Sequence, residues 1–250
     1  MVRLYCLENG LIQFDTSVYV PSLPRGTRRW GPIPTFLIQH SQGLVLVDTG
    51  CHPKVAEDPK YWGDLSRAMV PAVSQEHLAH NALKAAGFNP ESVDIVVNTH
   101  LHMDHAGGNQ LFPHATFLVQ QREWEFAATQ EGRGYFRNDW GHSLNYRQLE
   151  DEVYDVFGDG VVVLRRTGGH TPGHQVVEIN LASGKIILCA DVIPMRENLQ
   201  GEVPRNSIDA DETRSTAAWV LGRMALGAKV VFGHDGREWE SVRKAPNYYE

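Results

Sequence analysis

Three histidines and one aspartate stand within six residues near the middle of the chain. They are His100, His102, Asp104 and His105, in the string THLHMDHAGGN that spans residues 99–109. Imidazole nitrogens and carboxylate oxygens are ligands that zinc and other first-row divalent ions accept. A single histidine is more often an ordinary surface or core residue, but this density, with an aspartate between the rings, favours a metal site.

The spacing of these side chains suits two ions better than one. His100 and His102 follow an apolar run, and residues i and i+2 of an extended strand point to the same side. Both imidazoles can therefore face one ion. Asp104 and His105 follow at an expected turn, where the chain can direct them to a second position, and the two glycines after them allow tight backbone.

Three further donors stand at the ends of other expected strands. They are His170 in the segment GGHTPGHQ, Asp191 after the run IILCA, and His234 in the segment FGHD. Seven nitrogen and oxygen donors without a thiolate suit zinc, or iron, cobalt or manganese in its place. We therefore predict a site for two divalent metal ions, with zinc as the expected metal.

The elements that must position these residues alternate between β-branched runs and helical patterns. Strands are expected at 35–39, 44–47, 93–98, 115–119, 161–165, 176–180, 186–190 and 229–232, and helices at 74–86, 122–128 and 211–226. Residues 51–73 and 131–147 show no sustained period and are expected to be irregular. Strands followed by helices predict stacked sheets covered by helices, an α/β fold. No repeat or linker divides the chain, which predicts one domain over residues 1–250.

Other polar and aromatic side chains could support the site. Asp48, at the end of a strand, is equally compatible with orienting a ligand histidine and with a simple turn. His174 is expected to be structural or to contact a ligand histidine, and Asp235 is expected to be structural. The candidate walls of a substrate pocket are aromatic, although each of them is individually more typical of core: Trp30, Tyr61, Trp62, Phe126, Tyr135 and Phe136.

The composition argues against several classes of protein. A net charge of −7 argues against a nucleic-acid partner, because phosphate binding needs clustered basic residues. The three widely separated cysteines, Cys6, Cys51 and Cys189, cannot form a disulfide framework and fit the reduced cytosol. No window approaches the ~20 apolar residues of a membrane-spanning helix, and the N-terminus lacks the apolar core of a signal peptide. We therefore predict a cytoplasmic protein that acts on a small molecule, as a monomer or homodimer.

The arrangement of donors resembles the metallo-β-lactamase superfamily, whose signature is HxHxDH followed by distant His, Asp and His. The resemblance runs from Asp48-Thr49-Gly50 to Gly233-His234-Asp235, and within the superfamily the chain is most similar to the N-acyl-homoserine lactonases. It implies the α/β fold of that superfamily, a four-layer αβ/βα sandwich. It also implies a division of the donors, in which one ion is held by His100, His102 and His170, the other by Asp104, His105 and His234, and both by Asp191.

The resemblance implies a dinuclear metal-dependent hydrolase that opens a lactone ring, with an N-acyl-homoserine lactone as the expected substrate. Two ions that share a water lower its pKa toward neutrality, and the bridging hydroxide attacks the carbonyl carbon. The expected catalytic residues are Asp104, which orients the hydroxide and passes on its proton, and Asp191, which bridges the ions. One position departs from the family. The lactonases carry a tyrosine three residues after the bridging aspartate, where this chain has Pro194, so either another donor replaces that hydroxyl or the substrate differs.

Other functions fit parts of the pattern. The main alternative is hydrolysis of another small ester, lactone, amide or thioester. Thioesterases of the glyoxalase II type share the ligands, but they also have a basic C-terminal region. In this chain, residues 236–250 contain only three basic residues, Arg237, Arg243 and Lys244. A nuclease of the same fold would carry a basic insert, which the chain lacks. A flavin-linked di-iron oxidoreductase would have a carboxylate in place of His102. A non-catalytic relative would have lost donors that are all present here.

Overall fold

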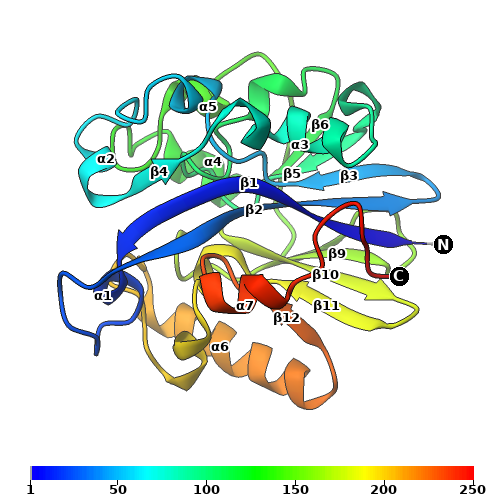
Figure 1. Cartoon of the computed structure of the whole chain (residues 1–250). Coiled ribbons are helices and arrows are strands. Elements are labelled where there is room, and N and C mark those ends of the chain that lie inside the picture. The colour runs from blue at the N-terminus through cyan, green and yellow to red at the C-terminus, as the bar shows by residue number, and fades with distance from the viewer. Residues whose placement is uncertain (1) are drawn as a thin grey trace.

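A computed structural model of the chain, which describes residues 2–250, contains two β-sheets that lie face to face (Figure 1). Met1, the first residue of the predicted domain, lies outside the described residues. The first sheet has seven strands, in the order β4 (Val70–Ala72), β1 (Arg3–Asp15), β2 (Arg28–His40), β3 (Gly43–Val47), β5 (Ile95–Val97), β6 (Thr116–Gln120) and β7 (Asn145–Leu149). The second sheet has five, in the order β12 (Lys229–Val231), β11 (Gly184–Leu188), β10 (Gln175–Leu181), β9 (Val162–Arg166) and β8 (Val153–Asp155).

The main core lies between the two sheets, because alternate residues of each strand point inward. In β2, Phe36 and Ile38 pack against residues of the second sheet, whereas Leu37 between them packs on the outer face. In β10, Val177 belongs to the core between the sheets and Val176 to the outer face. Both faces of each sheet are therefore apolar, and each outer face needs a covering layer.

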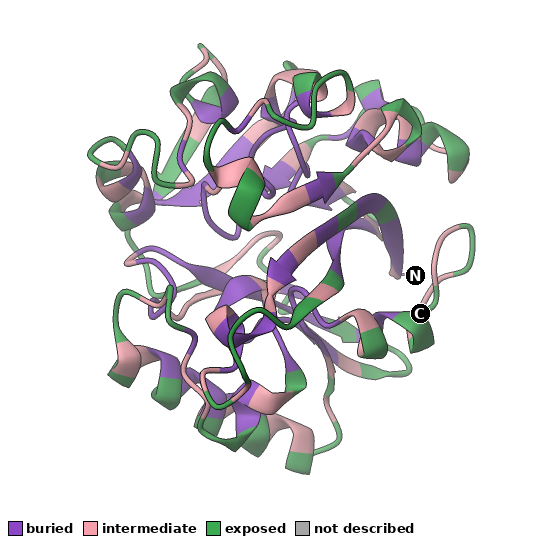
Figure 2. Cartoon of the chain, turned by 60° about the vertical axis from the view of Figure 1, so that its left-hand side comes forward, coloured by how far each residue is buried: buried purple, intermediate pink, exposed green. Residues whose placement is uncertain are grey.

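Helices form these covering layers (Figure 1). α3 (Ala79–Ala85) covers the first sheet with Leu83, and α6 (Ala210–Ala225) covers the second sheet with Val220. The other α-helices are α1 (Thr16–Tyr19), α2 (Leu65–Ala68), α4 (Gln121–Ala127), α5 (Arg137–Trp140) and α7 (Gly236–Ser241), and the 3₁₀ helices are η1 (Pro53–Ala56), η2 (Gln75–His77), η3 (Pro90–Ser92), η4 (Asn109–Leu111), η5 (Ala190–Val192) and η6 (Arg196–Gln200). Buried residues concentrate on the strands and on the inner sides of the helices (Figure 2). The predicted four-layer αβ/βα sandwich is confirmed.

All the strands predicted from the sequence are present. The structure also contains four strands that the sequence pattern does not predict: β1, β4, β7 and β8. β1 is the longest omission, and it pairs with β2 over most of its length. Its register shifts between Glu8 and Leu11, and Gly10 within that shift has a φ of +91°. This bulge breaks the alternation of apolar and polar residues, which is the sequence signal for a strand.

The segments expected to be irregular contain short elements, so that expectation is wrong in part. Within 51–73, β4 pairs with β1, and Pro71 is tolerated there because β4 is an edge strand. The second segment, 131–147, contains α5 and the start of β7, which pairs in parallel with β6. The helix predicted over 74–86 is divided at Leu78, whose ψ of 136° is extended. Elements this short carry too few repeats for their periodicity to be recognised.

Parallel pairing brings the ends of several strands together. β3, β5 and β6 are parallel in the first sheet, and β11 and β12 are parallel in the second. The carboxyl ends of parallel strands lie at the same edge of a sheet. The chain leaves β5 toward His100, β11 toward Asp191 and β12 toward His234. Residues far apart in the sequence are thus delivered to neighbouring positions.

Two expectations from the composition can be compared with the structure. All three cysteines are buried and free, as predicted for a chain without a disulfide framework. Among residues 2–250, no helix is both long enough and apolar enough to cross a membrane.

Gly107 lies where two backbone segments touch, so we expect a larger residue there to destabilise the fold. A Cβ at this position would lie 2.2 Å from the amide nitrogen of His52 and 2.5 Å from the carbonyl oxygen of Met103. Gly107→Ala should therefore lower the free energy of unfolding by about 1–3 kcal/mol or more, because backbone must move. Urea unfolding measures this change.

The matched control for that variant is Gly222→Ala. Gly222 lies inside α6, and apart from its chain neighbours and the backbone of its own helix, no atom of residues 2–250 lies within 4 Å of a Cβ built there. Alanine should raise the free energy of unfolding by about 0.5–1 kcal/mol, since it lowers the entropy lost on helix formation. A Gly107→Ala protein as stable as the wild type would contradict the close-approach interpretation.

Candidate metal centre

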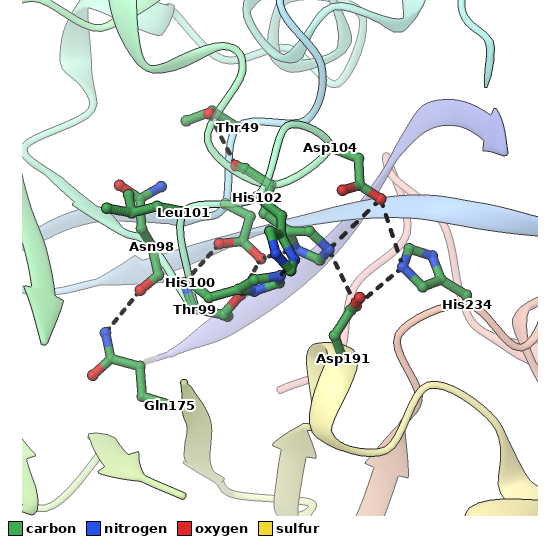
Figure 3. A network of polar contacts seen from close by, with 12 residues as sticks. Thr49, Asn98, Thr99, His100, Leu101, His102, Asp104, Gln175, Asp191 and His234 are labelled. Carbon is green, nitrogen blue, oxygen red and sulfur yellow. Dashed lines mark hydrogen bonds and ion pairs between the residues drawn. The ribbon is translucent and has the colours of Figure 1, made fainter. Parts of the chain in front are cut away.

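All seven predicted ligands converge at one edge of the sandwich. Their ligand atoms form two groups, and within each group these atoms all lie within 4.8 Å of one another. The first group is His100, His102, His170 and Asp191, and the second is Asp104, His105 and His234. They come from the segments that follow β5, β9, β11 and β12, so both sheets contribute (Figure 3). Each group could hold a metal ion.

The first group has the spacing of ligands around one ion. His102 Nδ1 lies 3.0 Å from His100 Nε2 and 3.0 Å from His170 Nε2. Two nitrogens bound to one tetrahedral zinc ion at about 2.0–2.1 Å are separated by roughly 3.3 Å. The rings are nearly perpendicular to one another, at 80° to 89°. Their nitrogens therefore converge without stacking of the ring faces.

Asp191 connects the two groups. Its Oδ1 lies 3.1 Å from His105 Nε2 and 3.0 Å from His234 Nε2, whereas its Oδ2 lies 3.5 Å from His170 Nε2. One oxygen thus faces each group, as a carboxylate that bridges two ions requires. Asp104 completes the second group, with its Oδ2 3.6 Å from His234 Nε2 (Figure 3).

These residues fit a bound cation, because several of their buried polar atoms have no hydrogen-bond partner within residues 2–250. The atoms are Asp104 Oδ2, His105 Nε2, Asp191 Oδ1 and His234 Nε2. Buried polar atoms without partners are rare in folded proteins and destabilise them. Since all four lie around the same small volume, a metal ion would satisfy them together.

Hydrogen bonds on the opposite nitrogens hold two of the rings in place. Asp48 Oδ2 accepts a hydrogen bond from His105 Nδ1 at 2.8 Å, and the carbonyl oxygen of Pro32 accepts one from His234 Nδ1 at 2.9 Å. Such bonds fix the tautomer and leave Nε2 free to face a metal. Of the two roles that the sequence leaves open for Asp48, the structure shows the orienting one.

Asp48 also organises the strand end before the first ligand. Its carboxylate accepts hydrogen bonds from the amide and the hydroxyl of Thr99, each at 2.8 Å, and that hydroxyl lies 3.1 Å from His100 Nδ1. Asp48 has a φ of +57°, and Ala190, which precedes Asp191, has a φ of +45°. A left-handed conformation costs a non-glycine residue of order 1–3 kcal/mol. Strained backbone therefore stands beside two segments of the site.

Glu123 ties together the loops of the first group, and nothing in its sequence context indicates this role. Its buried carboxylate accepts hydrogen bonds from the amide of Leu101 at 3.0 Å and from the hydroxyl of Thr171 at 2.6 Å. Leu101 lies between two of the candidate ligand histidines, and Thr171 directly follows a third. The hydroxyl of Tyr135 donates to the same carboxylate at 3.0 Å. Burial raises the pKa of Glu123, and these hydrogen bonds oppose that shift.

In the metal-free chain, the two groups hold protons differently. Burial lowers the pKa of His102 to about 4 and moves the pKa of the other two histidines of the first group well below the ordinary value. Burial also lowers the pKa of His105 and His234, but the nearby carboxylates, Asp191 first and then Asp104, together outweigh it and raise the pKa of both rings. In return, these rings hold the pKa of Asp191 well below its usual range despite its burial.

A cavity of about 290 Å³ opens onto the site, and His102, Asp104 and Asp191 are among its lining residues. Two of the predicted pocket walls, Phe126 and Tyr135, line it. The others do not: Tyr61, Trp62 and Phe136 belong to a core cluster, and Trp30 lines a different surface hollow. The apolar lining also includes residues that the sequence does not single out, among them Leu65, Met69 and Ile208.

Tyr19 is a further residue of the cavity that the sequence does not single out. It ends α1, and its ring stacks on that of His234 with centroids 5.5 Å apart and an angle of 22°. Burial raises the pKa of its hydroxyl well above the ordinary value, and the carboxylates of Asp191 and Asp104 add to the effect. A tyrosine can be placed here only from the tertiary contact, because α1 is far from the ligands in sequence.

His174 and Asp235 have the structural roles expected of them. His174 Nδ1 lies 3.0 Å from Thr167 Oγ1, and His174 belongs to neither ligand group. Asp235 accepts hydrogen bonds from the amides of Arg237 and Glu238 and so caps α7.

Comparison with known proteins extends this description. Residues 28–234 match the family model described as the Metallo-beta-lactamase superfamily. The chain is 34% identical over 260 residues to the N-acyl homoserine lactonase AttM of Azorhizobium caulinodans, covering 100% of this chain and 99% of that protein. It is 30% identical to the N-acyl homoserine lactonase AiiA of Bacillus thuringiensis subsp. kurstaki, covering 98% of both. A solved structure of an N-acyl homoserine lactone hydrolase, with the product N-hexanoyl-L-homoserine bound at its catalytic metal centre, is similar with a TM-score of 0.90 at 29% identity, covering 99% of this chain and 98% of that one.

We expect metal uptake to separate into two steps with pH. Because the pKa of His105 and of His234 is raised, these rings carry protons at mildly acidic pH, and a metal must displace them to bind. The histidines of the first group have lowered pKa values and are already neutral at that pH. Metal-free protein should therefore take up two Zn²⁺ per chain at about pH 8 and about one at about pH 5.5. Equilibrium dialysis followed by elemental analysis measures the ratio. Simultaneous loss of both ions over one pH range would contradict this assignment of protons.

Proposed function

Because the chain belongs to the metallo-beta-lactamase superfamily and, within it, to the N-acyl homoserine lactonases, we propose that it is a metal-dependent hydrolase that opens the ring of an N-acyl-homoserine lactone. The observation that carries the proposal is the convergence of five imidazoles and two carboxylates beside a cavity. Similarity to lactonases along the whole chain supports the choice of substrate.

The seven converging side chains are the proposed ligands of two divalent ions, with zinc as the expected metal. The proposed ligands of the first ion are His100, His102 and His170, those of the second are Asp104, His105 and His234, and Asp191 binds both. A donor set of nitrogen and oxygen without thiolate suits zinc, iron, cobalt or manganese. When bound, such ions lower the pKa of a water and polarise a carbonyl group.

Asp191 and Asp104 are the proposed catalytic carboxylates. Asp191 presents one oxygen to each group and so fixes their separation. Asp104 would use one oxygen as a ligand, while the other accepts the proton of the attacking water. The water oxygen forms a bond to the carbonyl carbon, the bond from that carbon to the ring oxygen breaks, and Asp104 passes the proton to the departing oxygen. The products are an alcohol and a carboxylic acid on one open chain, and the acid releases the second proton of the water to solvent and becomes a carboxylate.

The cavity suits an acyl chain attached to a small polar ring. Leu65, Met69 and Phe126 offer apolar surface, as ligand pockets for acyl groups require. Arg133 and Asn206 add hydrogen-bond donors to the same lining. An amide-linked fatty acyl group presents both kinds of surface.

The remaining proposals concern partners, compartment and organisation. We propose a cytoplasmic enzyme of one domain that acts as a monomer or homodimer on a small molecule, without nucleic-acid or membrane partners. A net charge of −7 supports the absence of a nucleic-acid partner, and three free, buried cysteines fit a reducing compartment.

The substrate proposal predicts a clear order of rates across a panel of carbonyl compounds. Metal-analysed protein should open N-hexanoyl- and N-decanoyl-homoserine lactone with kcat/KM at least about tenfold above that for a simple lactone, a β-lactam or a thioester, since only the acylated rings fill the apolar walls. Chromatography of the products measures each rate. Turnover of the thioester without turnover of any lactone would favour the glyoxalase II-like alternative and overturn the proposed substrate.

The bridging role predicts that Asp191→Ala abolishes hydrolysis and lowers the metal content. Removing the carboxylate leaves His105 and His234 without their counter-charge and takes one ligand from each group. Elemental analysis and lactone turnover should both fall to background. Asp211→Ala is the control: its side chain is 94% exposed and, among residues 2–250, pairs only with Arg214, so both readouts should match the wild type. An Asp191→Ala protein that keeps two ions and full activity would refute the bridge.

A further inference from the structure

Tyr19 is held rigidly at the wall of the cavity. Its ring stacks on His234, and the edge-on ring of Phe14 packs against it with centroids 4.6 Å apart. Its carbonyl oxygen accepts a hydrogen bond from Asn198 Nδ2 at 2.7 Å. Both the ring plane and the backbone are thus fixed, so the position of the hydroxyl is fixed as well.

The hydroxyl of Tyr19 has no partner in the protein. Tyr19 is 1% exposed, yet no hydrogen bond within residues 2–250 involves its hydroxyl. A hydroxyl that lines a cavity and has no partner in the protein keeps its donor free for a bound water or substrate. Tyr135, the other tyrosine of the same cavity, donates its hydroxyl to Glu123.

The hydroxyl belongs to the cavity that leads to the ligand groups. Tyr19 lines it together with Asp104 and Asp191. Position 194, three residues after Asp191, cannot supply such a donor, because Pro194 has no side-chain hydroxyl. Its carbonyl oxygen accepts a hydrogen bond from the amide of His234 at 2.8 Å. Tyr19 is therefore the phenol best placed to meet a substrate oxygen beside His234.

We propose that Tyr19 is a catalytic residue whose hydroxyl donates a hydrogen bond to the carbonyl oxygen of the substrate, a role that rests on the proposed lactone hydrolysis. The ring oxygen already has a proton donor in Asp104, whereas the carbonyl oxygen, which a bound ion would polarise, has no hydrogen-bond donor among the side chains assigned so far. Negative charge grows on that oxygen when water adds, and a fixed donor stabilises it more as the charge develops. In the opened product the same oxygen belongs to the carboxylate, which the hydroxyl continues to bind.

Tyr19→Phe tests the hydroxyl while keeping the ring that packs on His234. We expect kcat to fall on the order of a hundredfold with little change in KM, because the lost bond strengthens in the transition state. The affinity for N-hexanoyl-homoserine, measured by calorimetry, should fall by about tenfold or more. Metal content and melting temperature should match the wild type, since the ring contacts remain.

Two outcomes would overturn the proposal. A Tyr19→Phe protein with unchanged kcat and unchanged product affinity shows that the hydroxyl does not meet the substrate. A variant that loses metal in proportion to activity shows that Tyr19 only positions His234. Tyr5→Phe is the control, because Tyr5 is also buried but packs against Phe88 on the outer face of the first sheet. Its hydroxyl donates to Gln39 Oε1 at 3.3 Å, far from the cavity lining, so kcat, product affinity and metal content should equal the wild type.

The same experiment distinguishes a failure of the proposed lactone hydrolysis from a failure of the proposed role of Tyr19. The wild-type rate on lactones judges the proposed function, whereas the ratio of variant to wild type judges Tyr19. If the wild type hydrolyses another ester of the panel instead, that ester replaces the lactone, and an unchanged ratio on it still refutes the role of Tyr19.

Discussion

The structure depends on the confinement of five imidazoles and two carboxylates in one small volume at the edge of the sandwich. Their nitrogens and oxygens lie about 3 to 4 Å apart, and several have no hydrogen-bond partner within residues 2–250. Each buried polar atom left unpaired costs of order 1–3 kcal/mol, so the arrangement is unfavourable by itself. Divalent cations turn the same crowding into favourable coordination. The surrounding fold must therefore be stiff enough to keep the donors together before a cation arrives.

That stiffness comes from close contacts between backbones and from carboxylates outside the ligand groups. A Cβ at Gly233 would lie 2.5 Å from the carbonyl oxygen of Ala190, so the segments that carry Asp191 and His234 touch only because Gly233 has no side chain. Glu123 joins the loops of the first group through hydrogen bonds, and Asp48 does the same for the end of β5. The candidate metal centre is therefore held together by contacts that cannot be inferred from the positions of the seven donors in the sequence.

Features that follow from local pattern could be predicted from the sequence, whereas those that follow from tertiary contact could not. The seven donors stand at strand ends, where alternation fixes the direction of each side chain, so the histidines of the HxH pair were predictable from spacing alone. The division of donors into two groups came from family resemblance. β1 escaped prediction because a bulge at Gly10 breaks its alternation, and Tyr19 and Glu123 act on segments distant in the chain. Aromatic type alone could not separate Phe126 in the cavity from Trp62 in the core.

The candidate ligands come from both sheets, and this has a consequence for the whole molecule. The segment after β5 belongs to one half of the sandwich, and those after β9, β11 and β12 belong to the other, so Asp191 and its neighbours connect the two halves. Cations bound there would act as cross-links across the main core. A ligand that binds only the folded state stabilises it by about 1.4 kcal/mol for each tenfold rise in its free concentration above the dissociation constant. The lifetime of the folded chain in a cell would then follow the supply of metal, so that scarcity removes the protein itself as well as its activity.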